Sequence, residues 1–232
     1  MRHYLVQCLD SVFRASRDIR VEVFGVDNAS TGASVDSARR IFPQVHYIEN
    51  TENVGFARAN NQAIRQSAGE YVLLLNPDTV VGEDVLRGAI DFMNAHPQAG
   101  ATGTQMINRD GSFAFESRRG IPYPATAFYK ITGLCSLFPR NRVFGRYYMR
   151  YLDAAKPARI EAVSGAFFLL RRTALEQAGL LCEDYFMYGE DIDLSYTLLQ
   201  LGWQNWYQPF RILHYKGEST QKTSFRYVHS FY

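Results

Sequence analysis

The sequence predicts an α/β protein in which a mostly parallel sheet carries helices on both faces. Two observations lead to this prediction. Strand-like and helix-like segments alternate through the first two-thirds of the chain, and polar turn-forming residues separate them. With 232 residues, 47% of them hydrophobic and 21% charged, the chain can bury a sizeable core. In such folds, function is expected at the carboxyl ends of the strands.

The elements of this pattern follow one another from the N-terminus. An amphipathic helix is expected at 4–14, a buried strand at 21–26, a short polar helix ending near 42, a second strand at 45–49 and a helix at 56–67. The clearest strand, at 71–75, stops at Asn76-Pro77-Asp78, because proline lacks the N–H that a ladder needs. A helix at about 84–95 and a strand at about 101–106 complete the alternation.

The periodicity fades from 107 to 160, where aromatic and basic residues mix, most densely at 138–150. We interpret this stretch as an inserted, acceptor-side subdomain or functional loop region. Regular structure is expected to return with a strand at 166–171, a helix to 179, a helix at 191–201 and short strands at 203–207 and 211–214.

Composition excludes several classes of protein. A net charge of +2 is far from the basic excess of a nonspecific nucleic-acid binder. The apolar runs fall short of the ~18 residues of a bilayer span, and the N-terminus has no signal-peptide pattern, so a cytoplasmic protein is expected. Three scattered cysteines fit reduced thiols without a chemical role.

Two expected strand ends carry aspartates on polar turns. Asp27 either caps the helix that follows, in competition with Ser30, or contacts a ligand, and the sequence supports both equally. Asp78 follows a turn made rigid by proline, which aims its carboxylate out of the sheet edge. Such oxygen ligands suit Mg²⁺ or Mn²⁺ when a phosphate completes the coordination. Taken alone, an ordinary Asn-Pro-Asp turn is the more frequent explanation.

Three carboxylates stand at the start of the helix expected after 190. The positive end of the helix dipole explains acidic residues there. It does not explain the aromatic residues at 185–188, which would partly desolvate a carboxylate and raise its pKa toward that of a general base. His214, at the end of a strand, is by itself more often a structural histidine than a ligand.

Together, four stretches resemble the family 2 glycosyltransferases of the GT-A fold, a Rossmann-like α/β fold, and in particular the bacterial rhamnosyltransferase-type enzymes. They are VDNAST at 26–31, NTENVGFARANN at 50–61, LNPDT at 75–79 and GEDIDL at 189–194, with Gly202-Trp203 downstream. The likeness covers nearly the whole chain. It implies an inverting, metal-dependent transfer of a sugar from a nucleoside diphosphate to a hydroxyl acceptor, in cell-surface polysaccharide biosynthesis.

The resemblance also assigns roles on the donor side. Asp27 would contact the base or ribose of the nucleotide. The neighbouring nucleotide pocket would be shaped by Asn53, Gly55 and Asn60. The segment containing Ser164 and Gly165 would form the floor under the donor sugar, because small residues allow close approach.

The resemblance also assigns the metal ligands and the catalytic base to residues of the remaining motifs. Asn76 and Asp78 occupy the outer positions of the family's Asp-x-Asp motif. The first position is a neutral Asn here, so Mg²⁺ or Mn²⁺ would depend on Asp78, with His214 as a second ligand. Asp191 would take the proton from the attacking hydroxyl, and Glu190 is its nearest competitor for that role.

The chain also departs from the family. The buried first strand, expected just before the helix at 4–14, is absent from this sequence, which predicts an unpaired sheet edge, lost nucleotide contacts and a tendency of chains to pair. The tail at 224–232 resembles the start of a further helix. Trp203 is assigned to donor or acceptor binding. Its motif lacks the arginine of processive synthases, so we expect the transfer of one sugar residue and no polymerisation.

These assignments divide the chain into a nucleotide-sugar-binding half at 1–106 and an acceptor-binding and catalytic half at 107–223. The acceptor could be a lipid-linked saccharide at the inner face of a membrane, and the basic, aromatic stretch at 140–150 could then touch the lipid. A solvated basic surface is the slightly favoured interpretation of that stretch. The alternative function is a catalytically silent sugar-nucleotide-binding or scaffold protein, which the missing strand and Asn76 favour.

Overall fold

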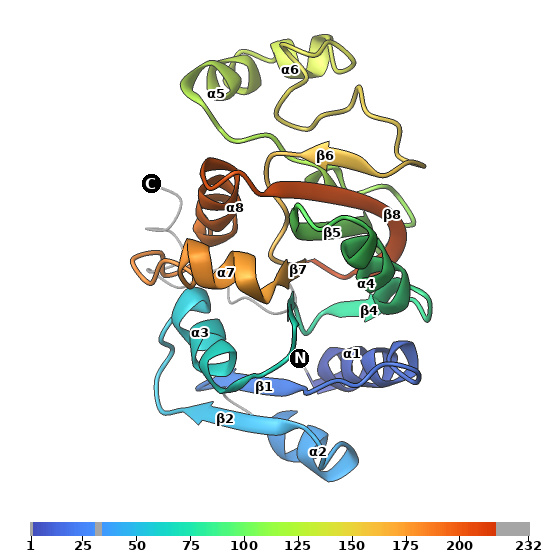
Figure 1. Cartoon of the computed structure of the whole chain (residues 1–232), viewed down its shortest axis with the longest axis vertical. Helices are drawn as coiled ribbons and strands as arrows, with labels where there is room; N and C mark the ends of the chain where they lie inside the picture. The colour runs from blue at the N-terminus through green and yellow to red at the C-terminus, as the bar shows by residue number, and fades with distance from the viewer. Residues whose placement is uncertain (1, 31–33, 217–232) are drawn as a thin grey trace.

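A computed structural model describes residues 2–30 and 34–216; the tail predicted at 224–232 lies outside these ranges. Figure 1 shows sheets through the middle of the molecule with helices around them. The helices are α1 (Arg2–Ala15), α2 (Ser34–Ile41), α3 (Phe56–Gln66), α4 (Val85–Ala95), α5 (Pro124–Ile131), α6 (Leu134–Leu137), α7 (Arg172–Ala178) and α8 (Glu190–Gln200). The strands are β1 (Phe24–Asn28), β2 (His46–Asn50), β3 (Tyr71–Leu75), β4 (Thr79–Val81), β5 (Ala99–Ile107), β6 (Ala158–Ile160), β7 (Phe167–Arg171) and β8 (Gln204–His214).

The strands form two sheets. β1 and β2 pair in parallel, and a six-stranded sheet has the order β3-β7-β5-β8-β4, with β6 also paired to β8. Within the larger sheet β5 and β8 are parallel, whereas β3 and β5 both run antiparallel to β7. The strands β3, β5 and β8 therefore share one direction, and β4, β6 and β7 run against them.

Helices cover both faces of the larger sheet, as predicted. One core cluster joins α3, α7 and α8 to the sheet through side chains such as Ile64, Leu175 and Leu198. A second cluster joins α1 and α4 to the other face through Val12 and Met93. The predicted α/β class with helices on both faces is confirmed.

Three details differ from the predicted elements. The strand predicted at 21–26 lies at 24–28, so Asp27 is within β1 and not in the turn after it. The segment after Asn76-Pro77-Asp78 forms the short strand β4, which was not predicted. The strands predicted at 203–207 and 211–214 are one strand, β8.

β8 stays continuous because a bulge accommodates its proline. Thr104 of β5 lies opposite Gln208, and the next residue of β5, Gln105, lies opposite Arg211. Pro209 and Phe210 are therefore skipped by the ladder. A bulge is one of the places where a strand tolerates proline, because the missing N–H has no ladder partner to lose.

Candidate active site

Asp78 is placed by the turn that links β3 to β4. The N–H of Asn76 donates to the carbonyl of Ala166 at 3.1 Å, and the hydroxyl of Thr79 donates to the carbonyl of Asn76 at 2.7 Å. These bonds fix the turn where the edge strand ends. Asp78 is only 1% exposed. Its carboxylate is therefore held at the carboxyl end of β3, as the sequence predicted for that residue.

His214 lies beside this aspartate. It is the last residue of β8 and stands opposite Thr79 in the antiparallel pairing of β4 with β8. Its Nε2 is 3.4 Å from Oδ1 of Asp78, and the N–H of Tyr215 donates to the Asp78 carbonyl. The tertiary pairing of β4 with β8 thus brings together two residues that are 136 positions apart in the sequence.

The two side chains fit a divalent cation in part. A carboxylate and an imidazole suit Mn²⁺ or Mg²⁺ when phosphate oxygens fill the other positions. Within residues 2–30 and 34–216, no three His, Cys, Asp or Glu side chains are grouped closely enough to hold a metal by themselves. The pair could therefore hold a cation together with a diphosphate, but not as an all-protein site.

Asp191 lies on the first turn of α8, against the loop before β7. Its Oδ2 accepts the N–H of Gly165 at 3.0 Å and forms a buried ion pair with Arg119. The same guanidinium donates to the carbonyl of Val163 at 3.1 Å. Burial lowers the pKa of Arg119, but the charge and hydrogen bond of Asp191, together with Tyr147 and Glu116, outweigh it, so this pKa lies above its ordinary value.

Residues 164–166 connect the two sites. The N–H of Gly165 contacts Asp191, and the carbonyl of Ala166 contacts the turn that carries Asp78. A Cβ at Gly165 would lie 3.6 Å from the Cβ of Asp191, which is an ordinary contact distance, so this position has room for no more than a small side chain beside the carboxylate. Ser164 accepts the N–H of Ala166 at 3.4 Å, which shapes this loop.

Glu190 differs from its neighbour. It is 5% exposed, and within the described residues its Oε2 has no hydrogen-bond partner. Burial, together with the charge of Asp191, raises its pKa to about 7. At neutral pH, Glu190 therefore holds a proton for much of the time, while Asp191 is engaged in an ion pair.

The residues assigned to the nucleotide have structural contacts of their own. Both carboxylate oxygens of Asp27 accept the N–H of Ser30 at 3.3 Å, which supports a turn-capping role. Asn53 accepts the N–H of Gly55, and Asn60 donates to the carbonyl of Phe56. The first contact stabilises the turn after β1, and the other two stabilise the backbone around the start of α3.

Gly55 is required by geometry. Its φ is +90°, and a Cβ there would lie 2.6 Å from the carbonyl oxygen of Phe186. The N–H of Phe56 donates to the same carbonyl at 2.8 Å. This close approach joins the 50–55 loop to the segment before α8.

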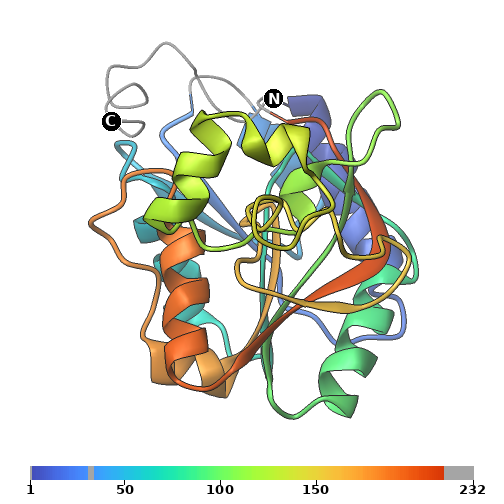
Figure 2. The same cartoon turned by 90° about the horizontal axis from the view of Figure 1, so that it is seen from above.

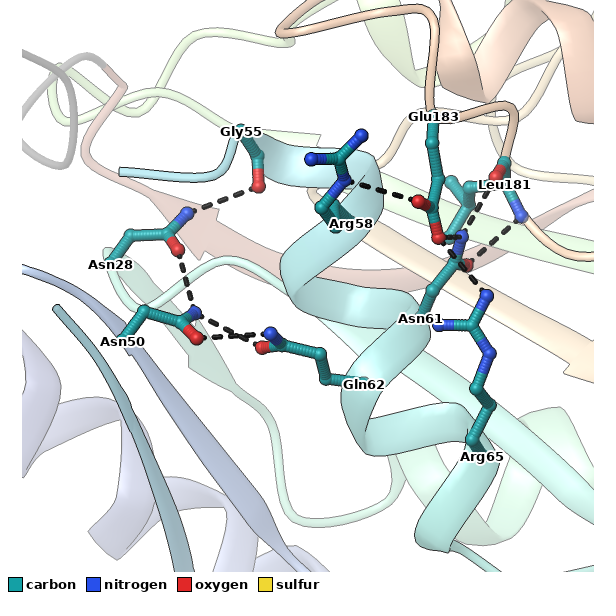
Figure 3. A network of polar contacts seen from close by, with 9 residues as sticks. All are labelled: Asn28, Asn50, Gly55, Arg58, Asn61, Gln62, Arg65, Leu181 and Glu183. Carbon is teal, nitrogen blue, oxygen red and sulfur yellow. Dashed lines mark hydrogen bonds and ion pairs between the residues drawn. The ribbon is translucent and has the colours of Figure 1, made fainter. Parts of the chain in front are cut away.

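A network of amide and charged side chains ties α3 to its surroundings (Figure 3). On one side, Asn50 bonds to Asn28 and Gln62. On the other side, Asn61 donates to the carbonyl of Leu181 and to Glu183. Arg58 and Arg65 complete this second group through ion pairs to the same glutamate. Helix α3 is therefore fixed to both β1–β2 and the segment before α8.

A hollow of about 330 Å³ opens beside this network. Asn53 is the one predicted site residue that lines it, and Asp78, His214 and Asp191 lie outside it. Its lining is Glu52, Asn53, Val54, Arg58, Glu183, Asp184 and Phe186. The hollow therefore lies beside the loop that carries Asn53, apart from Asp78, His214 and Asp191.

Trp203 is not brought to the other predicted site residues. It lies just before β8, at the opposite end of that eleven-residue strand from His214. Its indole N–H donates to Gln177 of α7 at 2.9 Å, and its side chain packs against Gly100. These contacts explain Trp203 as a packing residue, so the site described below does not include it.

Arg119 was not singled out from the sequence. It lies in the stretch where periodicity fades, and its partner Asp191 is 72 residues further along the chain. An Arg-Arg pair at 118–119 is the signal that could have drawn attention to it. Such a pair does not indicate which arginine is buried or what it contacts.

The chain matches the family model described as Glycosyl transferase family 2 over residues 2–179. It is 31% identical over 212 residues to an N-acetylglucosaminyl-diphospho-decaprenol L-rhamnosyltransferase of Mycobacterium tuberculosis, covering 86% of this chain and 68% of the relative. It is also 28% identical over 158 residues to the low-salt glycan biosynthesis hexosyltransferase Agl10 of Haloferax volcanii, covering 66% of this chain and 45% of that protein.

Solved structures share the fold. GalNAc-T7 with UDP, GalNAc and Mn²⁺ superposes with a TM-score of 0.64 at 18% identity, over 96% of this chain and 44% of that one. A mannosyltransferase of Pyrobaculum calidifontis with GDP-Man and Mn²⁺ gives 0.60 at 22% identity, over 97% and 55%. This chain thus spans about half the length of these two proteins. The likeness identifies a GT-A fold.

Proposed function

The chain belongs to glycosyl transferase family 2, and we propose that it moves a sugar from a nucleoside diphosphate sugar to a hydroxyl group of a saccharide acceptor, with inversion at the anomeric carbon. The class of activity, glycosyl transfer in glycan biosynthesis, follows from the family and its relatives. The observation that carries the more specific proposal is the loop 164–166, which contacts Asp191 on one side and the Asp78 turn on the other.

On the donor side, Asp78 and His214 would hold a divalent cation together with the diphosphate. A cation bound there would neutralise the negative charge that develops on the departing diphosphate. The protein's own contribution is placement. The bonds of Asn76 to Ala166 and Thr79 keep the turn against the sugar floor, and β4–β8 pairing keeps the imidazole beside the carboxylate.

On the acceptor side, Asp191 accepts the proton of the attacking hydroxyl. The hydroxyl oxygen forms a bond to the anomeric carbon as the bond from that carbon to the diphosphate oxygen breaks on the opposite face, and the proton passes to the carboxylate. The contacts with Arg119 and Gly165 fall on Oδ2, which leaves Oδ1 for the acceptor. Arg119 is therefore a positioning residue.

The acceptor class is proposed from the mycobacterial relative. That protein is named for transfer of L-rhamnose to N-acetylglucosaminyl-diphospho-decaprenol. A lipid-linked saccharide at the inner face of a membrane is accordingly the proposed acceptor for this chain. Within the described residues, no helix has the length and apolar character needed to cross a bilayer.

A sugar-nucleotide-binding protein without transfer activity is the second candidate. One structural observation favours it: Asp191 is engaged by Arg119, so the carboxylate is not free to act alone. Binding and turnover therefore have to be measured separately.

The test is calorimetric titration of UDP, GDP and dTDP with and without Mn²⁺, followed by assays of donor hydrolysis and transfer. In Asp78→Asn, the Mn²⁺-dependent part of nucleotide affinity is expected to fall at least tenfold, because the charged ligand is lost. Asp91→Asn, an exposed site on α4, is the matched control. Unchanged Mn²⁺-dependent affinity in Asp78→Asn would contradict the cation site. Binding without turnover would favour the second candidate.

A further inference from the structure

The segment 123–150, which contains α5 and α6, differs in charge from the rest of the molecule. It holds five basic residues, Lys130, Arg140, Arg142, Arg146 and Arg150, and no Asp or Glu. The whole chain has a net charge of +2, so the residues outside this segment carry a net charge of −3. The positive charge of the protein is thus concentrated on one segment.

The same segment exposes apolar side chains. Ile131 is 85% exposed and Leu137 is 70% exposed, although both could be buried in an ordinary core. Among the described large hydrophobic residues, five are more than half exposed, and four of them lie here: Phe128, Ile131, Leu137 and Val143. The fifth is Ile41, on α2. A single exposed apolar side chain is ordinary, whereas several on one part of a surface indicate an interaction site.

These side chains stand on a folded base. The ring of Phe144 packs against Tyr129 at 5.1 Å and against Phe138 at 5.7 Å, which joins α5, α6 and the loop after them. Figures 1 and 2 show α5 and α6 lying together, and Figure 1 places them at the end of the molecule opposite β1–β2. The face is therefore a structured one.

Four of the five basic side chains lie over aromatic rings, and one of these four, Arg146, is also paired with Glu161. Lys130 lies 4.1 Å from the ring centre of Tyr147, and Arg150 lies 4.3 Å from that of Phe115. A cation over a ring keeps its charge available to a further partner, whereas an ion pair neutralises it. Arginine and aromatic rings together suit the boundary between water and lipid headgroups.

The segment is also joined to the candidate active site. Gly120 directly follows Arg119, and its N–H donates to the carbonyl of Tyr147 at 2.9 Å. Glu161 binds Arg146 and also accepts the N–H of Ile121 at 2.7 Å. A surface bound at 123–150 would therefore lie next to the segment that carries Arg119, the ion-pair partner of Asp191.

We propose that 123–150 is a membrane-docking face that binds bilayers containing anionic phospholipids. The basic residues attract the phosphate-rich surface, and the exposed Ile131 and Leu137 enter the headgroup region, where their apolar area is removed from water. The aliphatic side chains favour a bilayer over an acidic protein or a nucleic acid, because charge alone would suffice for those partners. This inference deepens the proposed function by giving a lipid-linked acceptor a route to Asp191, and it has its own test.

The test is co-sedimentation of the full chain with vesicles of phosphatidylcholine alone or mixed with phosphatidylglycerol. The chain is expected to bind the anionic vesicles, more weakly at high salt because salt screens the attraction. Arg140→Glu with Arg142→Glu is expected to lower binding on the order of thirtyfold, and Ile131→Ser with Leu137→Ser about tenfold. Thermal unfolding of each variant reports whether it is folded.

Ile41→Ser is the matched control, because Ile41, like Ile131, ends an eight-residue helix, is more than half exposed and lies near arginines. It is expected to bind vesicles like the original chain. The proposal is overturned if the original chain does not bind anionic vesicles, if the apolar double variant binds as well as the original, or if Ile41→Ser loses binding to the same extent. Nucleotide titration is run in parallel, so that a failure of the transfer proposal is seen separately from a failure of docking.

Discussion

Charged groups are held in opposite ways at the start of α8 and in the segment 123–150. At α8, Asp191 and Arg119 are buried and neutralise each other, while Glu190 is buried and keeps a proton. In 123–150, Lys130 and Arg150 lie over aromatic rings and keep their charge, and within the described residues only Arg146 of this segment forms an ion pair, to Glu161. Burial forces a charge to find a partner or to titrate, whereas exposure allows an unbalanced charge to persist. The first arrangement suits proton chemistry and the second suits attraction of an anionic surface.

The sharpest test of this contrast is Asp191→Asn. An amide cannot accept the proton of the acceptor, so transfer is expected to fall on the order of a thousandfold, while nucleotide affinity stays the same. The measurement is initial rate of transfer together with calorimetry of the nucleotide. Asp193→Asn, two residues further along α8, is the control and should retain most of the activity. Equal losses in the two variants would remove Asp191 from the proposed role.

Arg119→Met tests how much the ion pair between Arg119 and Asp191 contributes to the stability of the fold. Leaving Asp191 buried without its partner is expected to lower the free energy of unfolding by about 3 kcal/mol. In the double variant with Asp191→Asn the second change should cost much less, because the two groups act as a pair. Denaturant unfolding of the two single variants and the double variant measures this coupling. Additive losses would mean that the ion pair contributes nothing to stability.

Arg119→Lys separates positioning from stability. It keeps the charge but not the planar guanidinium that reaches both Asp191 and the Val163 carbonyl. The rate of transfer at saturating donor and acceptor is expected to fall, with nucleotide affinity unchanged. An arginine that only stabilised the fold would alter unfolding without changing that rate.

Glu190 is expected to make the stability of the fold depend on pH. Its pKa is raised from 4.5 to about 7 in the folded chain, so the folded state binds a proton that the unfolded state releases. Stability from this residue is therefore full below about pH 4.5 and is lost as the pH rises through about 7, by about 3 kcal/mol. Glu190→Gln should remove this loss and be the more stable form at pH 8, with little difference at pH 4. If the free energy of unfolding of the original chain and of Glu190→Gln changed with pH in the same way, Glu190 would not be protonated in the folded state.

The sequence predicted best what depends on local pattern. The strand at 71–75 and the helix at 56–67 have strong periodicity and clear boundaries, and the structure has β3 and α3 at nearly those limits. The sequence predicted two short strands at 203–207 and 211–214, and only pairing with β5 shows that one strand passes Pro209 through a bulge. Local sequence pattern does not show whether pairing with a neighbouring strand can accommodate a proline through a bulge.

The candidate site was predictable in its residue types but not in its contacts. Strand ends and a helix start drew attention to Asp78, His214 and Asp191. Their roles were implied only by the resemblance to family 2 glycosyltransferases and stay predictions. Arg119 was missed because its role depends on a partner 72 residues away, and Trp203 was included because of its motif although its side chain packs on α7. Contacts of this kind are set by tertiary packing, which periodicity does not encode.

The bulge at Pro209 and Phe210 has a consequence for the phase of β8. Two residues are skipped, an even number, so the alternation of side chains between the two faces of the sheet continues unbroken on both sides of the interruption. Trp206 and Ile212, both even-numbered, accordingly pack on the same face, with Tyr207 on the other. An odd insertion at that point would have turned the imidazole of His214 to the wrong side of the sheet. The number of residues skipped at the bulge therefore decides on which face of the sheet the side chain of His214 lies.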